Sequence, residues 1–356
     1  MKKIFFTPGP SQLYPTVPGH IKKALDENIL SISHRGDKFH EIYESTIDSL
    51  KKLLKIPKSH HIFFLSSATE AMERIIENLV EKRSLHFVNG AFSSLFYETA
   101  LNLQKETTKV EAKAGEGFNF DKLDISARAE IACFTQNETS TGVSIPLDYI
   151  YKFKRSYPNL MVALDIVSSV PYIDVDYERI DCVFFSVQKG FGLPAGLGVL
   201  IISSQALEKS QRLAKTSKNG QTYHSFNNLL KYYDKKESPE TPNVLAIYLL
   251  GKVTDDFREQ TINSIRKRTE EKAALLYNFF KDSHKFSIFV KNEDFRSKTV
   301  IVAHVAGGSK PLIQILKNKG LVVGSGYRDF AQKQIRIANF PAHTTSDVYS
   351  LIKLIK

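Results

Sequence analysis

The fold is decided by a stretch that begins Ile62-Phe-Phe-Leu65, continues Ser66-Ser-Ala-Thr69 and runs on through residues 70–83. Its first four residues form an apolar run of strand character. Residues 70–83 repeat their apolar side chains at helical spacing with charged side chains opposite, and so predict an amphipathic helix. A strand, a small polar loop and a helix in this order predict one unit of a parallel sheet with crossover helices.

The same alternation continues along the chain. Further strands are expected at residues 85–88, 130–134, 161–165, 182–187 and 198–203, and helices at 93–103 and 146–155. From about residue 243 long helical stretches replace this pattern, followed by short strands at 287–290 and 300–305. We therefore predict an α/β fold with an N-terminal segment and large domain over residues 1–242, and a smaller C-terminal α+β domain over residues 243–356.

The composition is that of an ordinary globular protein. The chain has 356 residues, 42% of them hydrophobic and 24% charged, a length that fits about two domains. No apolar stretch approaches the roughly 20 residues of a membrane helix, and the N-terminus lacks the apolar run of a signal peptide. We therefore expect a cytoplasmic protein with no membrane partner. The two cysteines, Cys133 and Cys182, lie in apolar runs, which favours buried side chains over a disulfide or a metal site.

The formal net charge of +11 is open to several explanations. Such a surplus fits nucleic-acid binding, anionic substrates or a generally basic proteome. The basic residues are scattered over expected helix faces, without the aromatic-interleaved groove of a single-strand binder. We expect solvated helix faces, phosphorylated substrates as the second explanation, and no nucleic-acid partner.

One lysine stands out in Phe184-Phe-Ser-Val-Gln-Lys-Gly-Phe-Gly-Leu-Pro-Ala-Gly-Leu-Gly198. Lys189 follows an apolar strand and is surrounded by small residues, which leave room for an aldehyde cofactor to reach the amine. Asp165 closes another strand 24 residues earlier, and the ends of both strands fit one crevice. A carboxylate there keeps a pyridine ring protonated. The alternatives are a solvated surface lysine and an aspartate that caps the following turn.

Three loops after other strands add candidate cofactor contacts. Residues 66–69 precede a helix, where free backbone N–H groups and the helix dipole bind phosphate, although an ordinary helix cap is the alternative. Phe92 is able to stack on a flat cofactor, and Thr139 to hydrogen-bond its ring. Either residue is equally compatible with an ordinary core or turn position.

Together these residues resemble a family, the class V, fold type I pyridoxal-phosphate aminotransferases, over nearly the whole chain. The matching pieces are Thr7-Pro-Gly-Pro10, Ser33-His-Arg35 with Phe39, residues 66–72, Gly90 with Phe92, Asn137-Glu-Thr139 with Gly142, Leu164-Asp165 with Ser168-Ser169, Gln188-Lys189, Pro194-Ala-Gly196, Glu240-Thr-Pro242 and Arg336. The resemblance implies a mainly parallel seven-stranded sheet with helices on both faces, and pyridoxal 5'-phosphate as the cofactor.

The resemblance also implies residue roles. Lys189 becomes the lysine that forms the Schiff base with the cofactor, and Asp165 the partner of the pyridine nitrogen. Phe92 becomes the stacking ring, and Thr139 the contact of the ring oxygen.

For the cofactor phosphate the resemblance implies contacts from Ala68, Thr69 and Gln188. It also implies that Thr241 reaches this phosphate from a second subunit. A homodimer with active sites at its interface follows from that arrangement.

The substrate is less clearly indicated, because two branches of the family are represented. Thr7-Pro-Gly-Pro10 resembles the alanine–glyoxylate and serine–pyruvate branch, whereas other pieces resemble phosphoserine aminotransferases. Physical chemistry favours the second branch, because His34, Arg35 and Arg328 offer a cationic cluster for a phosphorylated substrate. The resemblance makes Arg336 the partner of the substrate α-carboxylate.

Two residues depart from the phosphoserine pattern. Tyr327 stands where that branch usually has histidine, and Glu240 where asparagine is expected beside Thr241. Three alternatives therefore stay open: an alanine–glyoxylate type of enzyme, an inactive regulator with this fold, and a nucleic-acid binder. If the chain is an alanine–glyoxylate type of enzyme, Arg35 and Arg328 bind no substrate phosphate and form only surface ion pairs with Asp37 or Asp329.

Overall fold

The structure, a computed structural model, describes residues 3–123, 125, 128–216 and 222–356. Its main sheet is built from β2 (His61–Leu65), β3 (Arg83–Val88), β4 (Glu106–Glu111), β5 (Ile131–Thr135), β8 (Met161–Asp165), β9 (Cys182–Ser186) and β10 (Gly198–Ile202). The strand order is β2-β10-β9-β8-β5-β3-β4, and every neighbouring pair is parallel except those of β10. A mainly parallel seven-stranded sheet is thus confirmed.

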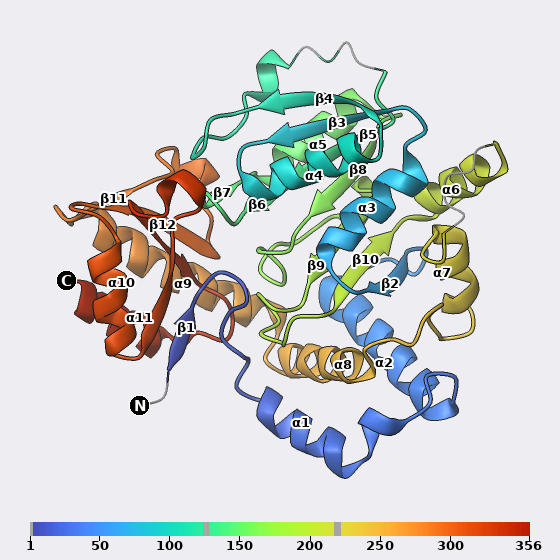
Figure 1. Ribbon diagram of the computed structural model, residues 1–356, viewed down its shortest axis with the longest axis horizontal. Coiled ribbons are helices and arrows are strands. Elements are labelled where there is room, and N and C mark those ends of the chain that lie inside the picture. Colours follow the sequence, from blue (N-terminus) through green and yellow to red (C-terminus); the bar gives the residue numbers. More distant parts are fainter. Residues whose placement is uncertain (1–2, 124, 126–127, 217–221) are drawn as a thin grey trace.

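Helices cover both faces of this sheet (Figure 1). They are α1 (Val17–Asp26), α2 (Asp37–Leu54), α3 (Ala68–Leu79), α4 (Ala91–Asn102), α5 (Leu147–Ser156), α6 (Ser204–Thr216), α7 (Phe226–Tyr233) and α8 (Val244–Glu259), with the short 3-10 turns η1 (Ile29–Ser31), η2 (Phe120–Lys122) and η3 (Tyr177–Arg179). In α3 the periodic residues Ala71, Ile75 and Leu79 are fully buried. Burial of one apolar stripe therefore orients the helix, and its N-terminus lies at the end of β2.

A second, smaller sheet lies beside the first and has the order β1-β13-β14-β12-β11. Its elements are β1 (Ile4–Phe6), β11 (Phe286–Ile288), β12 (Val300–Val305), β13 (Leu321–Ser325) and β14 (Gln334–Ala338), with α9 (Ile262–Lys281), α10 (Lys310–Asn318), α11 (Thr345–Ile355), η4 (Glu293–Phe295) and η5 (Arg328–Phe330). The N-terminal strand β1 pairs in parallel with β13. The start of the chain is thereby held beside its C-terminal part.

Helix α8 lies on the large-domain side of this division. The predicted boundary assigns residues 243–356 to the smaller domain, yet α8 packs against α1 and α2, and its residues Ile247, Leu250 and Phe257 are buried in the core of the main sheet. The division into two domains stays a prediction. No helix in the described ranges is both long and apolar enough to span a bilayer.

Candidate active site

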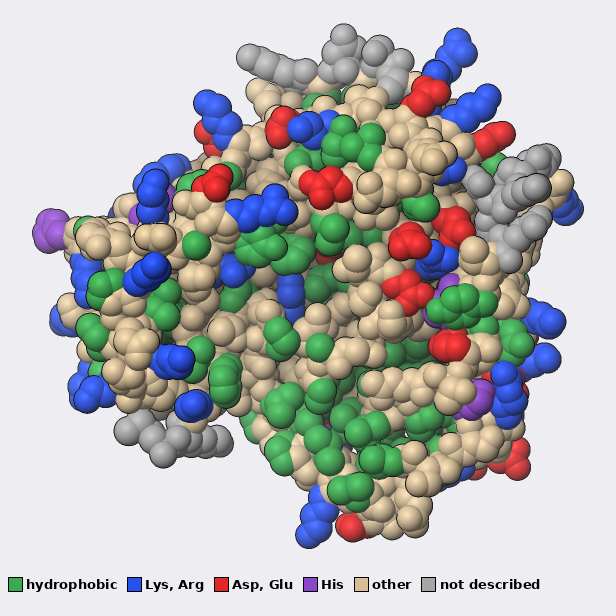
Figure 2. Space-filling view, viewed as in Figure 1, with side chains coloured by type: hydrophobic (Ala, Val, Ile, Leu, Met, Phe, Trp, Pro, Cys, Tyr) green, Lys and Arg blue, Asp and Glu red, His purple; other side chains and the backbone are tan. Residues whose placement is uncertain are grey.

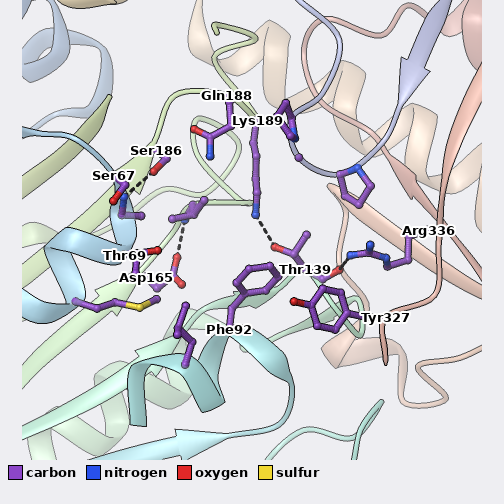
Figure 3. Close-up of a pocket in the computed structure, with 17 residues that line it drawn as sticks. Ser67, Thr69, Phe92, Thr139, Asp165, Ser186, Gln188, Lys189, Tyr327 and Arg336 are labelled. Carbon is purple, nitrogen blue, oxygen red and sulfur yellow. Dashed lines mark hydrogen bonds between the residues drawn. The ribbon is translucent and has the colours of Figure 1, made fainter. Parts of the chain in front are cut away.

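A cavity of about 230 Å³ opens where β8 and β9 end, between the main sheet and the N-terminal segment (Figure 3). Ligands of open α/β sheets bind at this edge, because loops there diverge from neighbouring strands. Eight of the predicted site residues line the cavity, namely Ala68, Thr69, Phe92, Thr139, Asp165, Gln188, Lys189 and Arg336. The loops that bear these side chains are far apart in the sequence, and the strand order brings them together.

The amine of Lys189 lies inside this cavity. Its Nζ donates to Thr139 Oγ1 at 2.8 Å and lies 5.0 Å from the ring centre of Phe92. Burial lowers the pKa of Lys189 to about 8, against the opposing charges of Asp165 and Glu138. An amine with this pKa is partly neutral near neutral pH, and is therefore available as a nucleophile or a base.

Asp165 is the last residue of β8, and its carboxyl group is buried in the cavity wall. Oδ1 accepts the backbone N–H of Val167 at 2.8 Å. Burial raises the pKa of Asp165 to about 7, although this hydrogen bond and the charge of Lys189 oppose the shift. A buried carboxylate is stabilised by a cationic partner, and a protonated pyridine nitrogen is such a group.

Polar groups gather at the other end of the cavity, around the N-terminus of α3. Ser67 caps this helix by accepting the N–H of Glu70 at 3.1 Å, and the N–H of Ala68 donates to Ser186 Oγ at 2.7 Å. Gln188 Oε1 is buried without a hydrogen-bond partner among the described residues. Hydroxyl groups, the NH₂ group of an amide and the positive end of a helix dipole suit a phosphate group. With the amine and the carboxyl group, they fit pyridoxal phosphate.

The Pro8-Gly9-Pro10 segment closes one side of the cavity. Gly9 has a φ of +148°, and a Cβ at this position would lie 2.8 Å from Lys189 Cε. Glycine is therefore required both for the backbone conformation and for the close approach to the lysine stem. This contact explains why the N-terminal quartet belongs to the sequence pattern.

Arg336 projects from β14 into the cavity. Its Nε donates to the carbonyl of Ser325 at 2.7 Å and its Nη1 to the carbonyl of Thr139 at 3.2 Å. Its guanidinium group lies 5.3 Å from the ring centre of Tyr327, which in turn lies 5.8 Å from the ring of Phe92. The guanidinium group is thus held in place, with capacity left to bind a carboxylate.

Arg328 also lies beside the ring of Tyr327. Its guanidinium group is 5.9 Å from the Tyr327 ring, and it lines an adjoining cavity of about 370 Å³ to which Tyr327 also contributes. Arg328 has a left-handed backbone, with a φ of 46°, which is uncommon outside glycine and is often found at functional sites.

Three predicted site residues lie outside both cavities of their own chain. Arg35 is exposed, forms an ion pair with Glu237 and stacks on Tyr232 at 5.4 Å. Its neighbour His34 is half-buried, and Thr241 is exposed in the segment before α8. The structure therefore does not join His34 and Arg35 to Arg328 within one chain.

Comparison with known proteins agrees with this geometry. The model of the class V aminotransferase family matches residues 4–346. The chain belongs to the class V aminotransferases. Family membership makes it a pyridoxal-phosphate-dependent aminotransferase.

The similar proteins are aminotransferases that carry several names. A crystal structure of a phosphoserine aminotransferase from Cytophaga hutchinsonii is 48% identical, covers 99% of this chain and 98% of its own, and superposes with a TM-score of 0.97. A phosphoserine aminotransferase from Rhodococcus opacus is 26% identical over 98% of this chain and 92% of its own. An alanine–glyoxylate aminotransferase from Nostoc, 23% identical over 100% and 96% of the two chains with a TM-score of 0.86, shows the same fold.

The structure accounts for one departure from the phosphoserine pattern, Glu240. Its Oε2 pairs with His224 Nε2 at 2.7 Å, and the other ring nitrogen pairs with Glu70. Burial alone would lower the pKa of His224, but the two carboxylates outweigh burial and raise it to about 9. The charge of Glu240 is therefore compensated beside Thr241.

This histidine should contribute to stability in a pH-dependent way. We expect His224→Ala to lower the free energy of unfolding at pH 7 by about 2 kcal/mol, below the range for fully buried pairs because Glu240 is partly exposed. The wild-type contribution is complete below the ordinary pKa of 6.5 and is lost as the pH rises through about 9. Urea unfolding of the wild type and of His224→Ala at pH 7 and pH 10 tests this prediction. An equal decrease in the free energy of unfolding at both pH values would contradict it.

Two polar residues at or beside the cavity, Ser186 and Glu138, were given no role in the sequence analysis. Ser186 accepts the N–H of Ala68, and Glu138 accepts the backbone N–H groups of Ser93 and Ser140. Ser186 reads as part of an apolar strand, and Glu138 as one polar residue of a turn. Only an accounting of buried donors and acceptors in the folded chain identifies them.

Proposed function

We propose that this aminotransferase exchanges an amino group between phosphoserine and 2-oxoglutarate, giving 3-phosphohydroxypyruvate and glutamate in a reversible reaction of serine biosynthesis. The relative that is 48% identical and bears the name phosphoserine aminotransferase supports this substrate. A single structural observation carries the proposal: Arg336 and Arg328 lie against one tyrosine ring, each lining its own cavity.

Two arginines beside one tyrosine ring suit a substrate with two anionic groups. Arg336 binds the α-carboxylate, which every amino-acid substrate carries. Arg328 binds the second anion, which phosphoserine has and alanine lacks. Guanidinium groups are well suited to both, because their paired N–H donors match carboxylate and phosphate oxygens.

The cofactor contacts follow from the same cavity. The N-terminus of α3 at Ala68, together with donors of Thr69 and Gln188, holds the cofactor phosphate, and Phe92 and Thr139 contact its ring. When bound, pyridoxal phosphate supplies a cationic ring that withdraws electrons from the substrate α-carbon.

Two residues then act on protons. Asp165 holds a proton at the ring nitrogen, because its buried carboxylate stabilises the positive charge there. Lys189 Nζ takes the proton from the substrate α-carbon, since its lowered pKa leaves part of the amine neutral. The same amine returns a proton in the reverse direction.

The proposal includes a homodimer. His34, Arg35 and Thr241 lie outside the cavities of their own chain and are accessible to a second copy. Leu25 and Leu30, in α1 and η1, are 56% and 49% exposed. Figure 2 shows hydrophobic side chains gathered over α1 and α8, as expected of an interface. In the dimer, Thr241 reaches the partner's cofactor phosphate, and His34 and Arg35 complete the partner's phosphate cluster.

A panel of half-reactions tests the proposal. The cofactor-loaded enzyme is mixed separately with phosphoserine, glutamate, alanine and serine, and conversion to the amine form of the cofactor is followed by absorbance. We expect rapid conversion with phosphoserine and glutamate, and slow conversion with alanine and serine. Preference for alanine or serine would instead support the alanine–glyoxylate type of enzyme.

Loss of either phosphate-binding arginine should act on one substrate only. We expect Arg328→Ala and Arg35→Ala to lower kcat/KM for phosphoserine by roughly 30-fold or more, as for a lost charged hydrogen bond, with little change for alanine. Steady-state kinetics measures kcat/KM for phosphoserine and for alanine in each variant, and the ratio of the two values is compared with that of the wild type.

Arg179→Ala is the matched control, because Arg179 also stacks on a tyrosine, Tyr151, at 5.4 Å, but lines neither cavity. It should leave both donors unchanged. Equal losses with phosphoserine and alanine in the Arg328 and Arg35 variants would remove these residues from substrate selection.

A further inference from the structure

Glu138 is a fully buried carboxylate whose surroundings consist of hydrogen-bond donors. It lies in the two-residue strand β6 (Asn137–Glu138), which pairs with β7 (Val143–Ser144). Its Oε2 accepts the backbone N–H of Ser93 at 2.9 Å and of Phe92 at 3.1 Å, and the hydroxyl of Ser93 at 2.9 Å. Its Oε1 accepts the N–H of Ser140 at 3.1 Å and the Ser140 hydroxyl at 2.6 Å.

These donors belong to two segments that both reach the cavity. Phe92 and Ser93 form the first turn of α4, and the ring of Phe92 lines the cavity. Ser140 follows Thr139, whose hydroxyl accepts from Lys189. The carboxylate therefore ties the backbone of the cavity residue Phe92 to that of Ser140, the residue after the cavity residue Thr139. It also satisfies N–H groups at a helix N-terminus, where a negative charge is favourable.

The close packing around this carboxylate explains a nearby glycine. A Cβ on Gly90 would lie 2.3 Å from Glu138 Cγ and 2.6 Å from Ser140 Oγ. Gly90 has an extended backbone, with a φ of 179°, so space and not conformation requires glycine. The side chains of Glu138 and Ser140 therefore fill the space that a side chain at position 90 would occupy.

The charge of Glu138 also acts on the reactive groups. Burial lowers the pKa of Lys189, and the negative charges of Asp165 and Glu138 oppose that shift. Burial likewise lowers the pKa of Arg336, opposed by Tyr327 and Glu138. A single carboxylate outside the cavity lining thus helps to keep both cations charged.

We propose that Glu138 is a positioning residue, whose buried carboxylate holds the backbone of Phe92 and Thr139 at the cofactor and maintains a negative charge within reach of Lys189. This inference rests on the cofactor contacts proposed above. Glutamine cannot replace the carboxylate, because one oxygen becomes an NH₂ group that faces the N–H donors.

The test uses Glu138→Gln in the full-length, cofactor-loaded enzyme. We expect the visible circular dichroism of the bound cofactor to fall at least about twofold, and its dissociation constant to rise about tenfold, as for one or two misplaced buried hydrogen bonds. The midpoint of the pH titration of visible absorbance should move to lower pH, because the lost negative charge favoured a protonated lysine nitrogen.

Glu130→Gln is the matched control. Glu130 also accepts three backbone N–H groups, those of Glu81, Lys82 and Arg83, at 2.9, 2.7 and 3.1 Å, but at the opposite end of the sheet. This variant should lose thermal stability while the three cofactor signals stay at their wild-type values. If both variants lose stability and neither changes the cofactor signals, Glu138 is only a helix cap and the proposal is wrong.

A second variant decides the matter if Glu138→Gln does not fold. Ser140→Ala removes the hydroxyl that donates to Glu138 Oε1 and keeps the carboxylate, so the circular dichroism and the dissociation constant should shift in the same direction by less, while the pH midpoint stays near its wild-type value. Wild-type circular dichroism and a wild-type dissociation constant in Ser140→Ala would then overturn the proposal. None of these readouts depends on the amino donor, so failure of the phosphoserine proposal is recognised separately, in the half-reaction panel.

Discussion

Lys189→Ala should abolish amino-group transfer, with a fall in rate of roughly four orders of magnitude or more. The variant lacks the only amine in the cavity lining, so no group remains to move the proton at the substrate α-carbon. The fold should persist, because burying an amine is unfavourable and alanine removes that cost. Single-turnover measurements test the rate, and circular dichroism with thermal unfolding tests the fold.

Lys209→Met serves as its control. Lys209 is also a largely buried lysine with a pKa lowered by burial, but it pairs with Glu130 and does not line the cavity. We expect full activity in this variant. Turnover of Lys189→Ala within tenfold of wild type would remove Lys189 from its proposed role.

Asp165→Asn should have the second largest effect, slowing the reaction about 100-fold or more while the cofactor stays bound. A neutral amide cannot hold the ring nitrogen protonated, so the ring withdraws electrons less strongly. The change should also lower the pKa of Lys189, because the charge of Asp165 opposes the downward shift that burial causes. The single-turnover rate should therefore be measured across the pH range.

Asp181→Asn is the control for this prediction. Asp181 is a buried aspartate that accepts the N–H of Val162 at 2.8 Å and pairs with Lys154 at 3.1 Å, at the start of β8 and not its end. It should reduce stability and leave the rate unchanged. Undiminished rates in Asp165→Asn would show that the cofactor ring does not need this carboxylate.

Much of the fold is predictable from local patterns. The apolar run of β2 and the periodic stripe of α3 specify their elements, since each buries one face against its neighbours. Strand β4 (Glu106–Glu111) was not predicted, because Glu-Thr-Thr-Lys-Val-Glu forms an exposed edge strand without an apolar run. The pairing of β1 with β13 also escaped prediction, because it joins Ile4 to Leu321 across the chain.

Part of the candidate site was also predictable from the sequence. Asp165 pairs with Phe184 in the sheet, so the chain that leaves β9 brings Lys189 to the end of β8. Spacing along parallel strands is enough to predict that meeting, because their ends share one edge. In the proposed dimer Arg35 and Thr241 act at the active site of the partner subunit, and no periodicity within one chain predicts such a contact.

Local sequence is therefore sufficient for the main strands and helices, and for which loops meet at the reactive edge. Packing alone decides that Arg336 lies against the ring of Tyr327, that His224 lies between two glutamates, and that Glu138 receives donors from Ser93 in a distant segment. Secondary structure follows from the burial of one face, which repeats along the chain and is visible in its periodicity. A buried charge instead selects whichever partners the folded chain brings within hydrogen-bonding distance, and some of these are distant in the sequence: Ser93 lies 45 residues from Glu138, and Glu70 lies 154 residues from His224.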